Sequence, residues 1–96
     1  MDKKAIEGFL TGLGIKELFD SSNNEDEYTI DLGDSDSYSR VYTILDKSDK
    51  VDLDADSTTM DENGTSLTYL GDDWDLTLSA NFDDNSYVLT VREAGE

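Results

Sequence analysis

The chain has 96 residues with 24 acidic and seven basic side chains, which gives a formal net charge of −17 at neutral pH. The length is typical of one domain, residues 1–96, and the absence of cysteine and histidine excludes disulfides, zinc–thiolate sites and the commonest nucleophile–base pairs. No apolar run approaches the ~20 residues of a membrane span and no signal peptide is evident, so we expect a cytoplasmic protein without membrane contact.

The first predicted element is a helical segment within residues 1–20. Its apolar side chains follow one helical face, at Ile6, Phe9, Leu10 and Leu13. Asp2 can cap the start of this helix, and residues 13–15 are typical of a Schellman end with a left-handed Gly14. Residues 16–19 fit a further helical turn or a short strand equally well. Residues 21–26 are expected to form a polar loop.

From residue 27 onward the apolar period falls from about 3.6 residues to about two, which predicts an antiparallel sheet over residues 27–92. The predicted strands are 27–32, 40–45, 51–56, 65–70, 74–81 and 87–92. Residues 33–37 are expected to form a turn, and Asn63-Gly64 is the strongest hairpin signal, favouring a type I′ turn. Because the connections are short, we expect an α+β fold: a meander of five or six strands covered by the N-terminal helix.

The acidic side chains are concentrated in the predicted sheet. Residues 25–96 hold twenty acids and four bases, a net charge of −16, against −1 for residues 1–24. Many of these aspartates fall in predicted turns, where aspartate is an ordinary residue. Five fall inside predicted strands, where aspartate is depleted: Asp31, Asp52, Asp54, Asp56 and Asp75.

Alternation along the predicted strand 51–56 places Asp52, Asp54 and Asp56 on one face, about 6.6–6.8 Å apart. Such a row resembles a line of backbone phosphates, which proteins bind chiefly with lysine and arginine. We therefore predict that the chain binds a basic, nucleic-acid-binding protein and does not itself bind nucleic acid. Exposed Tyr38 or Tyr42 can serve as anchors. The predicted partner-binding residues are Asp31, Asp46, Asp49, Asp52, Asp54, Asp56, Asp61, Glu62 and Asp75.

Small size, strong acidity and a mostly antiparallel sheet with an N-terminal helix resemble the DNA-mimicking inhibitors of phages and mobile elements. These include anti-CRISPR proteins, anti-restriction proteins and uracil-DNA glycosylase inhibitors. The resemblance extends over the whole chain, but it lies in size, charge and architecture only. No sequence motif assigns the chain to one family, and no functional residue can be transferred from a family to this chain. It implies a stoichiometric, salt-sensitive block of a nucleic-acid-binding enzyme, in the host cytoplasm if the protein is phage-encoded.

Other functional interpretations of the sequence remain open. The segment from Asp52 to Asp56 matches the opening D-x-D-x-D of an EF-hand loop, but Ser57 and Asn63 stand where that loop needs Gly and Glu. A different calcium site, a general acidic interaction module and adaptation to high salt remain alternatives. A carboxylate pair could serve a glycosidase, yet we expect no enzyme, no metal and no cofactor. The sequence leaves monomer and homodimer undetermined.

Overall fold

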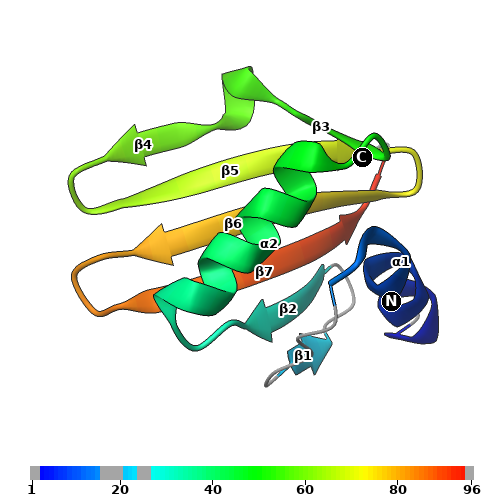
Figure 1. The fold of residues 1–96 in the computed structure, drawn as a ribbon, viewed down its shortest axis with the longest axis horizontal. Coiled ribbons are helices and arrows are strands. Elements are labelled where there is room, and N and C mark those ends of the chain that lie inside the picture. Colours follow the sequence, from blue (N-terminus) through cyan, green and yellow to red (C-terminus); the bar gives the residue numbers. More distant parts are fainter. Residues whose placement is uncertain (1–2, 16–20, 24–26, 95–96) are drawn as a thin grey trace.

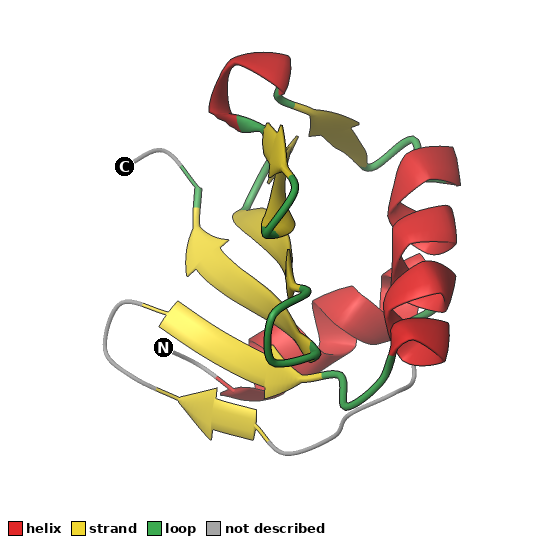
Figure 2. Ribbon diagram, turned by 90° about the vertical axis from the view of Figure 1, so that its left-hand side faces the viewer, coloured by secondary structure: helices red, strands yellow, loops and turns green. Residues whose placement is uncertain are grey.

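The described part of the chain, residues 3–15, 21–23 and 27–94 of a computed structural model, forms one antiparallel sheet with two helices on a single face (Figure 1, Figure 2). Over these residues the sheet has seven strands in the order β1-β2-β7-β6-β5-β3, and β4 also pairs with β5. The predicted α+β class, with the N-terminal helix packed on a sheet, is confirmed. In chain order the elements are α1 (Lys3–Leu13), β1 (Ser21–Asn23), β2 (Glu27–Asp31), α2 (Ser35–Lys47), β3 (Val51–Leu53), η1 (Ala55–Ser57), β4 (Thr59–Asp61), β5 (Gly64–Gly71), β6 (Trp74–Asn81) and β7 (Ser86–Glu93).

Helix α1 has the predicted apolar face and the predicted end. Ile6 and Leu10 are fully buried in the core. At the end of the helix Gly14 adopts φ 100°, and its N–H donates to the Thr11 carbonyl while the Ile15 N–H donates to the Leu10 carbonyl. These two hydrogen bonds define a Schellman motif, which turns the chain so that Ile15 enters the core.

Two predictions near the N-terminus, the Asp2 cap and the open choice at residues 16–19, lie outside the described residues. The predicted loop 21–26 is wrong in its first half, because Ser21–Asn23 forms β1 and pairs antiparallel with β2. A polar composition therefore did not prevent strand pairing at this edge of the sheet.

The predicted strand 40–45 is wrong, because these residues lie in helix α2. Val41 and Leu45 are both buried, and their spacing of four fits a helical face as well as a strand face. The predicted turn at residues 33–37 instead starts this helix: the Asp34 carboxylate accepts the Ser37 N–H at 2.9 Å, which is an N-cap. Helix α2 crosses the sheet from β2 to β3, so only β4 to β7 form a meander of sequence neighbours.

The Asp34 cap gives the fold a pH-dependent contribution. The hydrogen bond from the Ser37 N–H holds the pKa of Asp34 below its usual 3.8, so this contribution is complete above pH 3.8 and is lost as pH falls through the lowered value. Asparagine caps a helix without titrating. We expect the difference in unfolding free energy between wild type and Asp34→Asn to shrink on acidification, measured by urea unfolding at neutral and low pH. A difference independent of pH would contradict this origin.

The strands of the core alternate as predicted. Tyr28 and Ile30 of β2 and Leu32 directly after it are buried, and the same alternation buries Leu76 and Leu78 of β6. Their side chains meet those of α1 and α2 in one hydrophobic cluster. The helix-covered face of the sheet is therefore the dry face.

A hairpin is present at Asn63-Gly64 as predicted, but its turn is shifted and its first strand is β4, Thr59–Asp61, which was not predicted, instead of the strand expected at residues 51–56. Strands β4 and β5 pair antiparallel with Asp61 opposite Gly64, so the two loop residues are Glu62 and Asn63. Asn63 does not adopt a positive φ, and the turn is therefore not type I′. The Asp61 carboxylate instead accepts the N–H groups of Asn63 and Gly64, at 2.8 and 3.0 Å.

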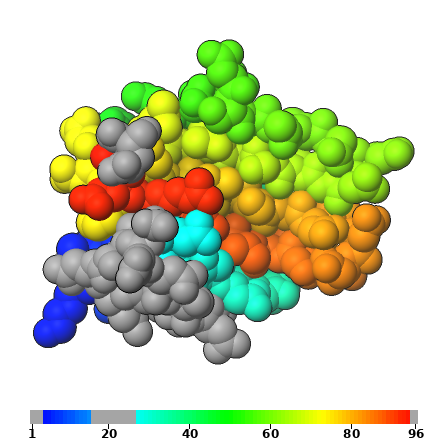
Figure 3. All heavy atoms as spheres, turned by 180° about the vertical axis from the view of Figure 1, so that it is seen from behind, coloured from blue at the N-terminus to red at the C-terminus, as the bar shows by residue number. Residues whose placement is uncertain are grey.

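The face opposite the helices is lined by hydroxyl side chains (Figure 3 views the molecule from this side). The strand register places Thr68, Thr77, Thr90 and Thr29 side by side across β5, β6, β7 and β2. Threonine pairs of this kind stabilise antiparallel sheets. The centre of the wet face is consequently neutral, and the large negative charge must lie elsewhere.

Candidate functional site: an acidic edge of the sheet

The predicted carboxylate row on a single extended strand is wrong. Strand β3 ends at Leu53, and the chain then turns into η1 before β4 begins. The cause is Asp54, whose carboxylate accepts the Asp56 N–H at 3.2 Å and caps η1. A local bond of this kind competes with strand pairing. As a result Asp52, Asp54 and Asp56 do not share one strand face, and Leu53 and Ala55 are exposed.

The fold nevertheless gathers most of the predicted residues at one border of the sheet, along the end of α2, β3, η1 and β4 (Figure 1). Strands β3 and β4 both pair with β5 at this border. Residues 46–62 contain seven acids and two bases, a net charge of −5. All but Asp54 of these acids are exposed. We call this set the acidic edge: Asp46, Asp49, Asp52, Asp54, Asp56, Asp61 and Glu62.

Two predicted residues, Asp31 and Asp75, lie away from the acidic edge and stabilise turns. The Asp31 carboxylate accepts the Gly33 N–H at 3.0 Å at the end of β2. Asp75 lies on the hydroxyl-lined face of β6, where its carboxylate accepts the Gly71 N–H at 3.3 Å. Their positions inside or beside strands therefore have a structural explanation, and neither belongs to the surface considered below.

Within the acidic edge the carboxylates divide into two groups. Those of Asp54 and Asp61 hold backbone N–H groups, as described above. The others form no side-chain hydrogen bond or ion pair with residues in the described ranges, which leaves their charges available to a partner: Asp46, Asp49, Asp52, Asp56 and Glu62. Sequence reasoning missed this division, although the run from Asp61 to Gly64 carries the signal of a carboxylate that bonds its own turn.

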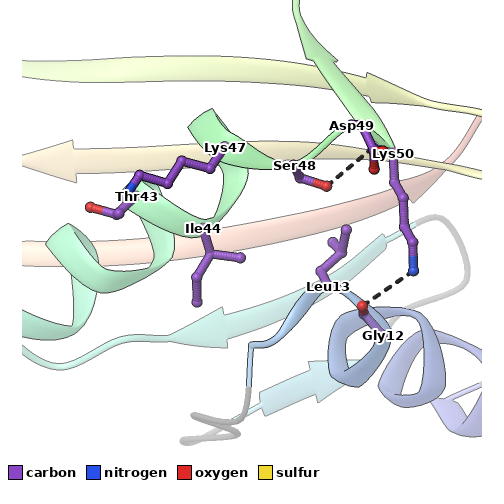
Figure 4. A pocket seen from close by; sticks show the side chains of 8 residues that line it. All are labelled: Gly12, Leu13, Thr43, Ile44, Lys47, Ser48, Asp49 and Lys50. Carbon is purple, nitrogen blue, oxygen red and sulfur yellow. Dashed lines mark hydrogen bonds between the residues drawn. The ribbon is translucent and has the colours of Figure 1, made fainter.

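Of the two lysines in residues 46–62, Lys50 forms a hydrogen bond within the fold. The Lys50 ammonium donates to the Gly12 carbonyl at 3.2 Å, reaching across to the C-terminal end of α1 (Figure 4). A cation there compensates the negative end of the helix dipole. Beside this contact Leu13 and Ile44 line a hollow of about 380 Å³ between the two helices. Lys50 therefore ties α1 to the sheet border.

A second hollow, of about 520 Å³, opens beside β3 and the β5–β6 turn. Four carboxylates and one ammonium line it, and Phe9 and Leu70 supply apolar walls. The excess of negative charge makes this hollow suited to a lysine or arginine side chain. Its lining residues are Phe9, Asp49, Lys50, Asp52, Leu70, Gly71, Asp72 and Asp73.

Calcium binding can be tested directly. Asp54, the middle aspartate of the EF-hand-like run, is committed to capping η1, and in the described ranges no group of three or more acidic side chains is arranged to hold a metal ion. We expect identical thermal melts in excess calcium and in EDTA. A higher melting temperature in calcium would show a stabilising ion site and contradict this expectation.

No protein-family model, curated protein or solved structure matches the chain. Among the helices that the structure describes, none combines the length and the apolar character needed to cross a bilayer.

Proposed function

We propose that the chain is a non-enzymatic, DNA-mimicking inhibitor that uses its acidic edge to occupy the nucleic-acid-binding surface of a basic protein. The observation that carries the proposal is the gathering of seven acids along one border of the sheet, five of them without a partner in the described part of the chain. Surfaces that bind nucleic acid present lysine and arginine to phosphates. A line of exposed carboxylates offers them an equivalent set of negative charges.

The proposed mechanism is steric and electrostatic. The net charge of −17 steers the chain towards a basic surface and accelerates encounter at low ionic strength. Once bound, the chain covers the contacts that nucleic acid would make. The resemblance to phage and mobile-element inhibitors supports a target such as a CRISPR nuclease, a restriction enzyme or a repair enzyme, met in the host cytoplasm.

The shape of the acidic edge also favours a second candidate. The border bends at η1, so its carboxylates follow the fold rather than the even spacing of a phosphate backbone. A general acidic module that captures basic segments, without imitating nucleic acid, would use the same charges.

Affinity capture separates the two candidates. We expect the immobilised chain to retain nucleic-acid-binding proteins from a lysate of the organism that carries its gene, and to release them along a salt gradient. Retention should fall steeply with salt, because the contacts are ionic. Recovery of basic proteins that bind no nucleic acid would favour the general module, and the absence of salt-sensitive retention would remove both candidates.

A further inference from the structure

Two large apolar side chains next to the acidic edge are uncovered although they lie on the core face of the sheet. Leu53 is 49% exposed and Met60 is 69% exposed. In the register Leu53 lies opposite Tyr69 and Met60 opposite Thr65. Cross-strand partners share a face, and Tyr69 is buried in the core beneath α2. The core face therefore continues past the helix to an apolar border that no described residue covers.

One flank of α2 faces this border. Tyr38, Tyr42 and Asp46 follow one another at intervals of four residues, so they share one side of the helix. The Tyr38 hydroxyl hydrogen-bonds the Thr65 hydroxyl at 2.8 Å, which fixes this side towards β5. The opposite flank, with Ile44, faces α1 (Figure 4). Tyr42, 42% exposed, thus extends the apolar border from the sheet onto the helix.

The core beside this apolar border contains a buried polar group that forms no hydrogen bond with a described residue. The Tyr69 hydroxyl is buried and has no hydrogen-bond partner among the described residues. Burial raises the pKa of Tyr69 to about 12, and Tyr42 and Asp46 add to the rise, so the hydroxyl stays protonated and both side chains lie near it. Unpaired buried donors are costly and rare in folded proteins.

We propose that Tyr42, Leu53 and Met60 form an apolar shelf on which a basic polypeptide segment of the partner docks. The proposal rests on the proposed function and names the kind of segment that the acidic edge meets. Apolar side chains of the segment pack on the shelf, while its lysines or arginines meet Asp46, Asp56 and Glu62. An apolar centre with a charged rim is the usual anatomy of a protein interface.

The negative charge of the chain indicates which kind of partner can bind to the shelf. A second copy of a chain with a net charge of −17 would place like charges against the acidic edge, and anionic lipid or nucleic acid would be repelled in the same way. A basic polypeptide alone among these satisfies both the apolar side chains and the carboxylates around them.

The test compares two synthetic peptide probes. One is an amphipathic helix of leucine and lysine, and the other has glutamine at every leucine, which keeps the charge and a similar helix propensity. Fluorescence anisotropy with the full chain should show about tenfold tighter binding of the leucine probe. The double variant Leu53→Ser/Met60→Ser should abolish that preference and leave the glutamine probe unaffected.

The control is Phe82→Ser, because Phe82 is 47% exposed in the β6–β7 turn and lies outside the shelf; it should keep the preference. Tyr42→Ser provides an independent test if the double variant folds poorly. A preference that survives substitution of the shelf residues, or equal binding of both probes by wild type, would overturn the shelf. Failure of the proposed function gives a different result, because the preference for the leucine probe would then persist while affinity capture retains no nucleic-acid-binding protein.

Discussion

Replacing Gly64 by alanine is expected to destabilise the fold by about 1–3 kcal/mol, a large part of the ~5–14 kcal/mol typical of a chain this size. A Cβ atom at Gly64 would overlap the Ala80 carbonyl oxygen and lie 3.3 Å from the Asn81 Cα. These are backbone atoms of the paired strand β6, so no side-chain rotation relieves the overlap. Urea unfolding followed by Trp74 fluorescence should show a lower midpoint.

The matched control is Gly8→Ala in helix α1. A Cβ at Gly8 meets no atom within 4 Å, and alanine at a helix interior is favoured over glycine by roughly 0.5–1 kcal/mol. We expect this variant to be more stable than wild type. If the two alanine variants shift the midpoint in the same direction, the close approach of β5 and β6 at Gly64 is not the cause.

Removing three free charges from the acidic edge is expected to weaken partner binding by about tenfold or more. The variant is Asp49→Asn/Asp52→Asn/Asp56→Asn, since none of these carboxylates forms a side-chain hydrogen bond or ion pair with a described residue. Asp54 is left intact because it caps η1. The affinity should be measured by titration calorimetry against the captured partner, at two or more salt concentrations.

The control removes the same three charges elsewhere, in Asp36→Asn/Asp84→Asn/Glu93→Gln. These exposed residues lie in α2, the β6–β7 turn and β7. Long-range steering depends on net charge and falls equally in both variants, whereas direct contacts are lost only in the edge variant. The salt dependence of the affinity should therefore decrease more for the edge variant. Equal losses would mean that net charge alone, without a defined edge, governs binding.

Strands β5 to β7 could be predicted because their signals are local. Each alternates apolar and polar side chains, and each pairs with its neighbour in sequence through a short turn. Strand β4 was not predicted, because its three residues are all exposed and show no alternation of burial. Helix α2 could not be predicted in the same way. Its centre, Val41 to Ile44, is rich in β-branched and aromatic residues that favour strands. Whether these residues form a helix or a strand depends on the connection from β2 to β3, which crosses the sheet. This tertiary constraint outweighs local propensity.

The candidate site was predicted in region but not in geometry. The aspartates in the predicted strands have a structural role in three cases. The carboxylates of Asp31, Asp54 and Asp75 each accept a hydrogen bond from a nearby backbone N–H. Aspartate ends or redirects a strand by such local bonds. The apolar side chains of Leu53 and Met60 carried no sequence signal of exposure, because their burial depends on how far α2 extends over the sheet.

The central claim is that the acidic edge and nucleic acid compete for the same surface of a basic partner. The most direct measurement titrates the chain into a complex of that partner with fluorescently labelled double-stranded DNA and follows both anisotropy and gel mobility. We predict complete release of the DNA at one chain per binding site, with the edge variant releasing it only at higher concentration. A ternary complex that retains the DNA while the chain is bound would contradict the claim.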